Sequence, residues 1–384
     1  MSAIPPDWAR SLVDPQLFQV EQRALAHVWT FLGLTRDVAR DGDWIRASIA
    51  TRSVFVQRFG DELRGFENLC AHRFYPLRNA DKGNGPLICG YHHWQYNRDG
   101  VAVGIPVCAD MYGKPPHEMD ARLNRIEIAA CGAMIFGRFP SPTATETLEE
   151  FLGDAFPILE GVTRMKIAPR YLASGIQANW KLNMHISLDD YHNPAVHPAT
   201  FGKKGYLTVE NCHYVRMGVH SAFLQTRNEH AFDRLLAGSR DGSFRSDHYF
   251  ILQILPDLMV AHVDADHRFW FVNIMQYAPV AVDRTAFRSW SFPTPFEEDL
   301  SWFGRATRPI TDRFRRPLYF HYYKQVVRQD IAVCERLQTV AHQIDRAPML
   351  GALEERIAWF EDSMRELTGR AAKAMEMKEQ ETGQ

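Results

Sequence analysis

The first half of this 384-residue chain is organised around Cys70-Ala71-His72 and Cys89-Gly90-Tyr91-His92, two short segments that each pair a thiol with an imidazole. Two thiolates suit one ferric iron, while two neutral imidazoles leave a second iron less negatively ligated and therefore easier to reduce. The pattern predicts a [2Fe–2S] cluster, with each segment supplying one ligand to each iron. The predicted ligands are Cys70, His72, Cys89 and His92.

A zinc knuckle is the alternative for these four residues, because mixed Cys/His sets at short spacings also bind tetrahedral zinc. Zinc sites more often use Cys-x2-Cys pairs, so the alternating Cys/His order favours the cluster. His93 follows His92 directly, and we expect it to be a surface or supporting group and not a ligand.

Length and composition narrow the class of protein. A chain of 384 residues with 46% hydrophobic residues can bury large cores, and we expect two or three domains. The net charge of -2 gives no basic excess of the kind that nucleic-acid binding needs. The six cysteines are too scattered for a secreted disulfide framework, and no signal peptide or membrane-spanning run is visible. We therefore expect a cytoplasmic protein without membrane partners.

Apolar positions at helical spacing predict an N-terminal helical arm over residues 1–40. Residues 41–140 are then predicted to form a small all-β domain. Its turn signals include Gly60-Asp61 and Asn97–Gly100, so both Cys/His segments fall at hairpin loops, and further strands are expected at 126–128 and 134–136. This domain should end at the Pro140-Ser141-Pro142 linker.

Residues 141–384 form the expected second domain. After a short helix containing Leu148, apolar runs at 249–255, 258–263 and 269–277 are separated by turn signals. These runs predict an antiparallel meander with long helices on either side in the sequence. The fold class predicted for the whole chain is therefore α+β.

A second cluster of polar side chains lies between Asp189 and His197, where two His and two Asp fall within nine residues. That is the density of a metal site. On an ideal helix His192 and His197 would not share a face, since five residues rotate the side chain by about 140°. Pro194 lies between them and disfavours regular helix, so a bend in the chain can turn both imidazoles toward one site.

The best third ligand in the sequence is Asp330. On a helix it falls in line with Val327 and Cys334, and a carboxylate on an apolar stripe is costly to bury unless something pairs with it. Two His and one carboxylate form a facial triad suited to non-haem Fe(II), with positions left open for oxygen. Asp189 and Asp190 both precede His192, so either carboxylate could act beside it. Glu335 is a weaker alternative to Asp330 as the third ligand.

These motifs together resemble a known family. The pattern Cys-x-His-x16-Cys-x2-His, with Arg73 and Trp94 after the two pairs, is similar to a Rieske motif. The Asn-Trp-Lys start at 179–181, the Asp-x-Tyr-His-x4-His core at 189–197 and the Gln-Asp-Ile helix at 329–331 resemble the catalytic domain of Rieske-type aromatic ring-hydroxylating oxygenases. The resemblance covers most of the chain.

The resemblance implies roles for particular residues. His192, His197 and Asp330 become ligands of a mononuclear Fe(II), and Asp189 becomes the acid that links the two redox centres. The departures from the family pattern are Ala71 and Gly90 after the cysteines, His93 after His92, and His185-Ile186 where many relatives have Glu-Asn.

The resemblance also implies the reaction and the partners. The expected protein is the terminal oxygenase component, which uses O2 and electrons from a reductase or ferredoxin to hydroxylate a small organic, aromatic substrate. In the family the electron crosses between neighbouring subunits, so a head-to-tail homotrimer is expected, with or without a β subunit. The alternatives are an oxidative N- or O-demethylase of the same family and a Rieske electron carrier without oxygenase activity.

Overall fold

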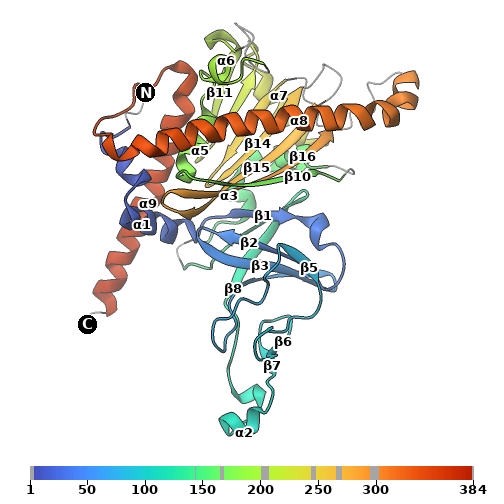
Figure 1. Ribbon diagram of the computed structural model, residues 1–384, viewed down its shortest axis with the longest axis vertical. Helices are drawn as coiled ribbons and strands as arrows, with labels where there is room; N and C mark the ends of the chain where they lie inside the picture. The colour runs from blue at the N-terminus through green and yellow to red at the C-terminus, as the bar shows by residue number, and fades with distance from the viewer. Residues whose placement is uncertain are drawn as a thin grey trace. The chain divides into compact units, whose positions relative to one another are not determined.

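The computed structural model describes residues 4–142, 144–164, 168–199, 207–243, 248–264, 270–294 and 302–382 (Figure 1). The chain divides into two compact units: one is Leu25–Phe151, and the other combines Met1–Ala24 with Leu152–Gln384. None of the helices in the described ranges has both the length and the apolar character that crossing a bilayer requires.

The Leu25–Phe151 unit is built on a seven-stranded sheet in the order β1-β9-β8-β4-β3-β2-β5. Its strands are β1 (Thr30–Leu34), β2 (Asp43–Ile49), β3 (Arg52–Phe59), β4 (Glu62–Glu67), β5 (Lys82–Asn84), β8 (Arg125–Cys131) and β9 (Met134–Arg138). This unit also contains the ribbon β6 (Gln95–Tyr96) and β7 (Ala102–Gly104), helix α2 (Cys108–Tyr112) and two 3-10 turns, and helix α3 (Leu148–Leu152) lies at its boundary. The predicted hairpin at Gly60-Asp61 is confirmed as β3 and β4, and the two later strands as β8 and β9.

The N-terminal helical arm is shorter than the sequence indicated. A 3-10 turn at Trp8–Leu12 and helix α1 (Pro15–Leu25) are followed by Thr30–Leu34, which forms strand β1 and pairs with β9. All five residues of β1 are buried. A short run buried on both faces has no polar side, so apolar spacing alone does not distinguish it from a continuing helix.

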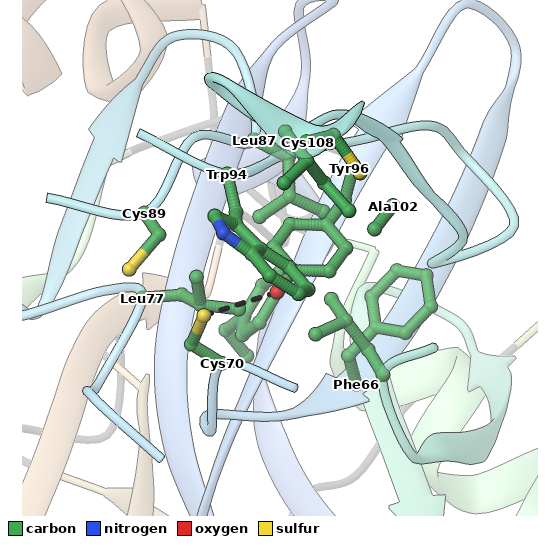
Figure 2. Close-up of a cluster of buried hydrophobic side chains, with 12 residues drawn as sticks. Phe66, Cys70, Leu77, Leu87, Cys89, Trp94, Tyr96, Ala102 and Cys108 are labelled. Carbon is green, nitrogen blue, oxygen red and sulfur yellow. Dashed lines mark hydrogen bonds between the residues drawn. The ribbon is translucent and has the colours of Figure 1, made fainter. Parts of the chain in front are cut away.

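A cluster of buried side chains lies against the two Cys/His segments (Figure 2). Its aromatic members Phe55 and Phe66 come from the sheet, and Trp94 and Tyr96 follow the second segment. Cys70 and Cys89 belong to the same buried cluster. The sheet therefore supplies an apolar base on which both loops are held.

The second unit contains an antiparallel seven-stranded sheet in the order β10-β16-β15-β14-β13-β12-β11. Its strands are β10 (Arg170–Ile176), β11 (Cys212–Met217), β12 (His220–Gln225), β13 (Phe250–Ile254), β14 (Leu258–Asp264), β15 (Trp270–Ala281) and β16 (Arg284–Thr294). The predicted meander is confirmed as β13, β14 and β15, although the second of its two turn signals lies partly outside the described residues.

Helices complete this unit: α4 (Ala155–Val162), α5 (Trp180–Leu188), α6 (Asn193–Val196), α7 (Ala231–Arg240), α8 (Trp302–Val340) and α9 (Glu355–Thr382). The long α8, drawn in orange in Figure 1, runs across the strands of the sheet. A hydrogen bond from Asn273 to Tyr319 and another between Ser289 and Tyr323 join β15 and β16 to α8. The α+β class predicted from the sequence, a small β domain and a larger sheet with helices, is confirmed.

Candidate metal centres and substrate cavity

The two Cys/His segments fold into the same backbone turn. In each, the N–H four residues after the Cys donates to the Cys carbonyl, and the Cys N–H donates to the carbonyl five residues on, at 2.9–3.0 Å. The pairs are Phe74 with Cys70, Cys70 with Tyr75, His93 with Cys89, and Cys89 with Trp94. Phe74 and His93 both adopt left-handed φ, at 59° and 57°. His93 therefore departs from the family pattern at a position that favours glycine.

The four predicted cluster ligands lie together. Cys70 and Cys89 are 2% and 1% exposed, and Figure 2 shows their sulfur atoms pointing into the same space. The rings of His72 and His92 are 4.7 Å apart at 66°. The Nδ1 atom of His92 is buried and has no hydrogen-bond partner. A buried polar atom is normally satisfied, so two thiols and two imidazoles in this arrangement fit a metal cluster.

Tyr96 supports the first cysteine. Its hydroxyl lies 3.0 Å from the Sγ of Cys70, the dashed line in Figure 2, and accepts the N–H of Ala71 at 3.1 Å. Because the hydroxyl already accepts the Ala71 N–H, its own proton is available to the sulfur. His72 stacks on Trp94 with ring centroids 4.8 Å apart. The sequence offered no signal for this role of Tyr96.

The second candidate centre is formed by three atoms from α8 and from the segment after α5. The Nε2 of His197 lies 3.0 Å from the Oδ1 of Asp330, and the Nε2 of His192 lies 3.7 Å from the same atom. The two Nε2 atoms are 3.2 Å apart. One ligand atom from each of the three residues lies within 4.8 Å of the other two, which is close enough for all three to bind one ion.

Neighbouring side chains determine which ring nitrogens face the centre. The Nδ1 of His197 lies 2.9 Å from the Oε1 of Gln329, which is an acceptor, so Nδ1 carries the proton and Nε2 presents a lone pair. The Nδ1 of His192 faces the Oδ2 of Asp189 at 3.4 Å. The Oδ1 of Asp330 is buried and accepts no hydrogen bond. Three lone-pair atoms facing one another fit a bound cation.

The electrostatics around His192 agree with this geometry. Burial alone would lower the pKa of His192, but the carboxylates of Asp189 and Asp330 outweigh that effect and raise it. A site that favours a proton on an imidazole also favours a divalent cation at the same place.

Local structure explains how these ligands are placed. Helix α5 ends at Leu188, and the Oδ1 of Asp189 then accepts the N–H groups of Tyr191 and His192 at 2.7 and 3.1 Å. The four-residue α6 begins with Asn193-Pro194, and His197 follows it. The prediction that Pro194 disrupts helical geometry between the two His is wrong, because residues 193–196 form α6 with Pro194 in its first turn, where proline is tolerated. The chain instead departs from helical geometry at Asp189 and again at His197, where φ is -117°.

The two rival carboxylates have other partners. The Oδ2 of Asp190 accepts the hydroxyl of Tyr214 at 2.9 Å, and burial raises the pKa of Asp190 to about 6. Glu335 accepts the N–H of Gln177 at 3.0 Å. Asp189 is therefore the acid whose carboxylate lies against a predicted ligand.

A buried ionic network fixes α5, and sequence analysis missed it. Lys181 is 1% exposed and forms an ion pair with Glu21 of α1, while His185 lies 2.8 Å from Glu361 of α9. Burial would raise the pKa of Glu361, but the hydrogen bond from His185 outweighs it and the pKa is lowered. His185, a departure from the family pattern, thus has its own partner. The partners lie up to 176 positions away in sequence, so no local pattern reveals them.

A cavity opens beside the triad, with an empty volume of about 860 Å³ that includes solvent at its mouth. All three triad residues and Asp189 line it, and most of the remaining wall is apolar or aromatic. A concave wall of mainly apolar and aromatic side chains with a few polar groups is typical of sites for small organic ligands. The triad therefore faces a space in which a substrate could lie close to a bound metal.

Two family descriptions match the sequence. Residues 28–116 match the Rieske [2Fe-2S] domain, and residues 156–371 match the catalytic domain of the ring hydroxylating alpha subunit. The second match alone spans more than half of the chain.

Curated relatives agree with these matches. The large oxygenase component of salicylate 5-hydroxylase from Ralstonia sp. is 29% identical over 242 residues, which cover 58% of this chain and 56% of that protein. The large subunit of anthranilate 1,2-dioxygenase from Acinetobacter baylyi is 28% identical over 193 residues, covering 48% and 41%. The chain spans about half the length of these relatives.

Solved structures share the fold. A quaternary ammonium Rieske monooxygenase in complex with an inhibitor superposes with a TM-score of 0.73 at 17% identity, with 95% of each chain covered. Naphthalene 1,2-dioxygenase from Rhodococcus sp. bound to indole gives a TM-score of 0.71 at 20% identity, with 94% of each chain covered.

Proposed function

This chain belongs to the ring-hydroxylating alpha-subunit family, and from that premise we propose that it is the terminal oxygenase component of a Rieske non-haem iron system. The observation that carries the proposal is the convergence of His192, His197 and Asp330 at the wall of a cavity. A Rieske electron carrier has no use for that triad or cavity, so this alternative is not favoured.

We assign the cofactors to the residues already described. Cys70, His72, Cys89 and His92 would hold the [2Fe–2S] cluster in the Leu25–Phe151 unit, which extends the expected 41–140 domain at both ends. His192, His197 and Asp330 would hold Fe(II) in the other unit, which combines Leu152–Gln384 with Met1–Ala24. When bound, the cluster supplies electrons one at a time, and the ferrous site binds and activates dioxygen.

The side chains around these ligands have distinct tasks. Gln329 fixes the Nδ1 proton of His197, and Asp189 faces the corresponding nitrogen of His192. Asp189 is 18% exposed, so it also presents an edge to solvent from which a redox partner can approach. The apolar cavity excludes bulk water and orients the substrate.

The partners we propose are O2, a small organic and aromatic substrate, and a reductase or ferredoxin as electron donor. The named relatives include enzymes for salicylate, anthranilate and naphthalene. We also propose a cytoplasmic homotrimer, in which the cluster of one subunit serves the iron of the next, with or without a β subunit.

Metal analysis of anaerobically purified protein tests the proposal. We expect about three irons and two sulfides per chain, and a Rieske-type EPR signal after reduction. Reduced protein mixed with 18O2 and an aromatic probe should incorporate label into a hydroxylated product, whereas loss of a methyl group from a methoxy probe would identify a demethylase. Light scattering should give a trimer of the 44.2 kDa chain. Zinc in place of iron would overturn the assignment.

A further inference from the structure

The charges of the cavity wall restrict its substrate, and this inference rests on the proposed function. Among the described lining residues, the acidic side chains are Asp189, Asp190 and Asp330, and none of the lining residues is Lys or Arg. Among these described residues, a substrate carboxylate away from the triad would find no side chain of opposite charge. Burial of a carboxylate without such a partner is costly, so the wall disfavours anionic substrates.

The aromatic part of the cavity wall is made mainly of tyrosines. Five of the described lining residues are tyrosines, three of them from α8: Tyr249, Tyr277, Tyr319, Tyr322 and Tyr323. The rings of Tyr319 and Tyr323 lie nearly parallel, with an interplanar angle of 6°. Flat aromatic surfaces favour a flat apolar ligand that stacks or meets them edge to face.

Asn273 is the polar exception on the sheet side. It lies on β15, between Ala261 of β14 and Ser291 of β16, and is 2% exposed. Its Nδ2 donates to the hydroxyl of Tyr319 at 2.6 Å. Its Oδ1 is buried and has no hydrogen-bond partner, although the residue lines the cavity. A native protein rarely leaves such an acceptor unsatisfied, so the atom points to a ligand.

The position of this acceptor along the cavity is set by α8. Tyr319, which holds the amide of Asn273, and Asp330 of the triad are separated by about three helical turns, or ~16 Å along the axis. Asn273 therefore lies at the end of the cavity away from the triad. A ligand that reaches both ends is longer than a single benzene ring.

We propose that the cavity takes an uncharged aromatic substrate of about two fused rings carrying a hydroxyl or N–H group, which donates a hydrogen bond to the Oδ1 of Asn273. Asn273 is then a specificity-determining residue, and Tyr319 is the positioning residue that fixes its amide. The opposite end of the substrate lies at the triad.

Binding of three matched probes tests this inference without turnover. Equilibrium dialysis of anaerobic, oxidised holoenzyme would compare 2-naphthol, 2-methylnaphthalene and 2-naphthoate, which present a donor, an apolar group of similar size and an anion at one position. We expect 2-naphthol to bind about tenfold more tightly than 2-methylnaphthalene, since the hydroxyl satisfies a buried acceptor. The naphthoate should bind most weakly. Equal affinity for the three probes, or tightest binding of 2-naphthoate, would overturn the inference.

Variants of the wall residues show which side chain causes the preference for 2-naphthol. Asn273→Leu should abolish the tenfold ratio of affinities between 2-naphthol and 2-methylnaphthalene. Tyr319→Phe, which keeps the asparagine, should reduce that ratio. Met275→Leu, on the same face of β15 and also lining the cavity, should leave the ratio unchanged. A ratio that survives Asn273→Leu in folded protein contradicts the assignment.

The two proposals fail separately. Equal binding of 2-naphthol and 2-methylnaphthalene, together with labelled product from either, overturns the role of Asn273 and leaves the oxygenase intact. The expected binding ratio in a protein that contains zinc and forms no product supports the cavity assignment and overturns the oxygenase.

Discussion

The two candidate metal centres are built by opposite means. The cluster ligands all lie between Cys70 and His92, in two segments of the sequence. The same pattern of backbone hydrogen bonds holds each segment in the same kind of turn. The triad joins His192 and His197 to Asp330 of α8, and side chains such as Gln329 orient its ligands.

This difference predicts different sensitivities. A turn held by its backbone tolerates many side chains, as the departures at Ala71, Gly90 and His93 show. A site assembled from distant elements depends on the packing that brings those elements together and on each orienting side chain. Substitutions near the triad should therefore affect function more than equivalent changes near the cluster, the ligands aside.

The largest expected effect comes from removing the distant ligand. Asp330→Ala should lose about one iron per chain and reduce turnover at least ~1000-fold, while the cluster signal in EPR remains. Glu335→Ala, five residues further along α8, should keep the iron and the turnover because Glu335 accepts the N–H of Gln177 instead. Turnover retained in Asp330→Ala would contradict the assignment of Asp330 as a ligand of the mononuclear iron.

Next in size is the buried ion pair that anchors α5. Lys181→Met leaves Glu21 buried without its partner and should destabilise the catalytic unit by about 3–5 kcal/mol. Denaturant unfolding followed by fluorescence measures this loss, and the cluster absorbance reports the other unit. Lys82→Met breaks an ion pair in which Lys82 is 67% exposed and should cost less than ~1 kcal/mol. Equal losses in the two variants would refute the argument.

Asp189→Asn tests the orientation of His192. The amide keeps the size of the side chain but removes the charge that faces Nδ1, so we expect turnover to fall about 10–100-fold with the cluster unchanged. Stopped-flow absorbance of cluster reoxidation would show the slowed step. A variant that reoxidises at the native rate would leave Asp189 without the proposed role.

On the cluster side, Tyr96→Phe removes the hydroxyl that lies 3.0 Å from the Sγ of Cys70. A hydrogen bond to sulfur stabilises the reduced cluster, so its loss should lower the reduction potential by roughly 40 mV, the equivalent of about 1 kcal/mol for one electron. Redox titration followed by EPR measures the shift. A higher potential in the variant would contradict the assigned hydrogen bond.

The smallest effect concerns the repeated turn itself. His93→Gly places the residue best suited to left-handed φ at 57° and should stabilise the cluster unit by about 1 kcal/mol. The temperature at which cluster absorbance is lost should rise. Tyr91→Gly, in the same loop and outside the positive-φ positions, serves as the control and should not raise it. Stabilisation by both would show that loop flexibility, not strain, is the cause.

Local sequence patterns predicted most of the fold. The hairpin at Gly60-Asp61 and the meander followed from turn residues and alternating apolar runs, because those signals act over a few residues. Strand β1 was predicted as helix because its partner, β9, lies about a hundred residues away. Asn273, Gln329 and Tyr96 were likewise invisible, since their roles depend on contacts with distant residues.

By itself the sequence predicted the ligand types and the spacing of the two Cys/His pairs, because each is a property of neighbouring residues. Tertiary structure alone decided that Asp189 and not Asp190 faces His192, that Lys181 and His185 are buried with acidic partners, and that Asn273, in the cavity wall, has a buried acceptor without a partner. The physical reason is that charge pairing and hydrogen-bond satisfaction are settled by packing, which brings together side chains that no local pattern relates.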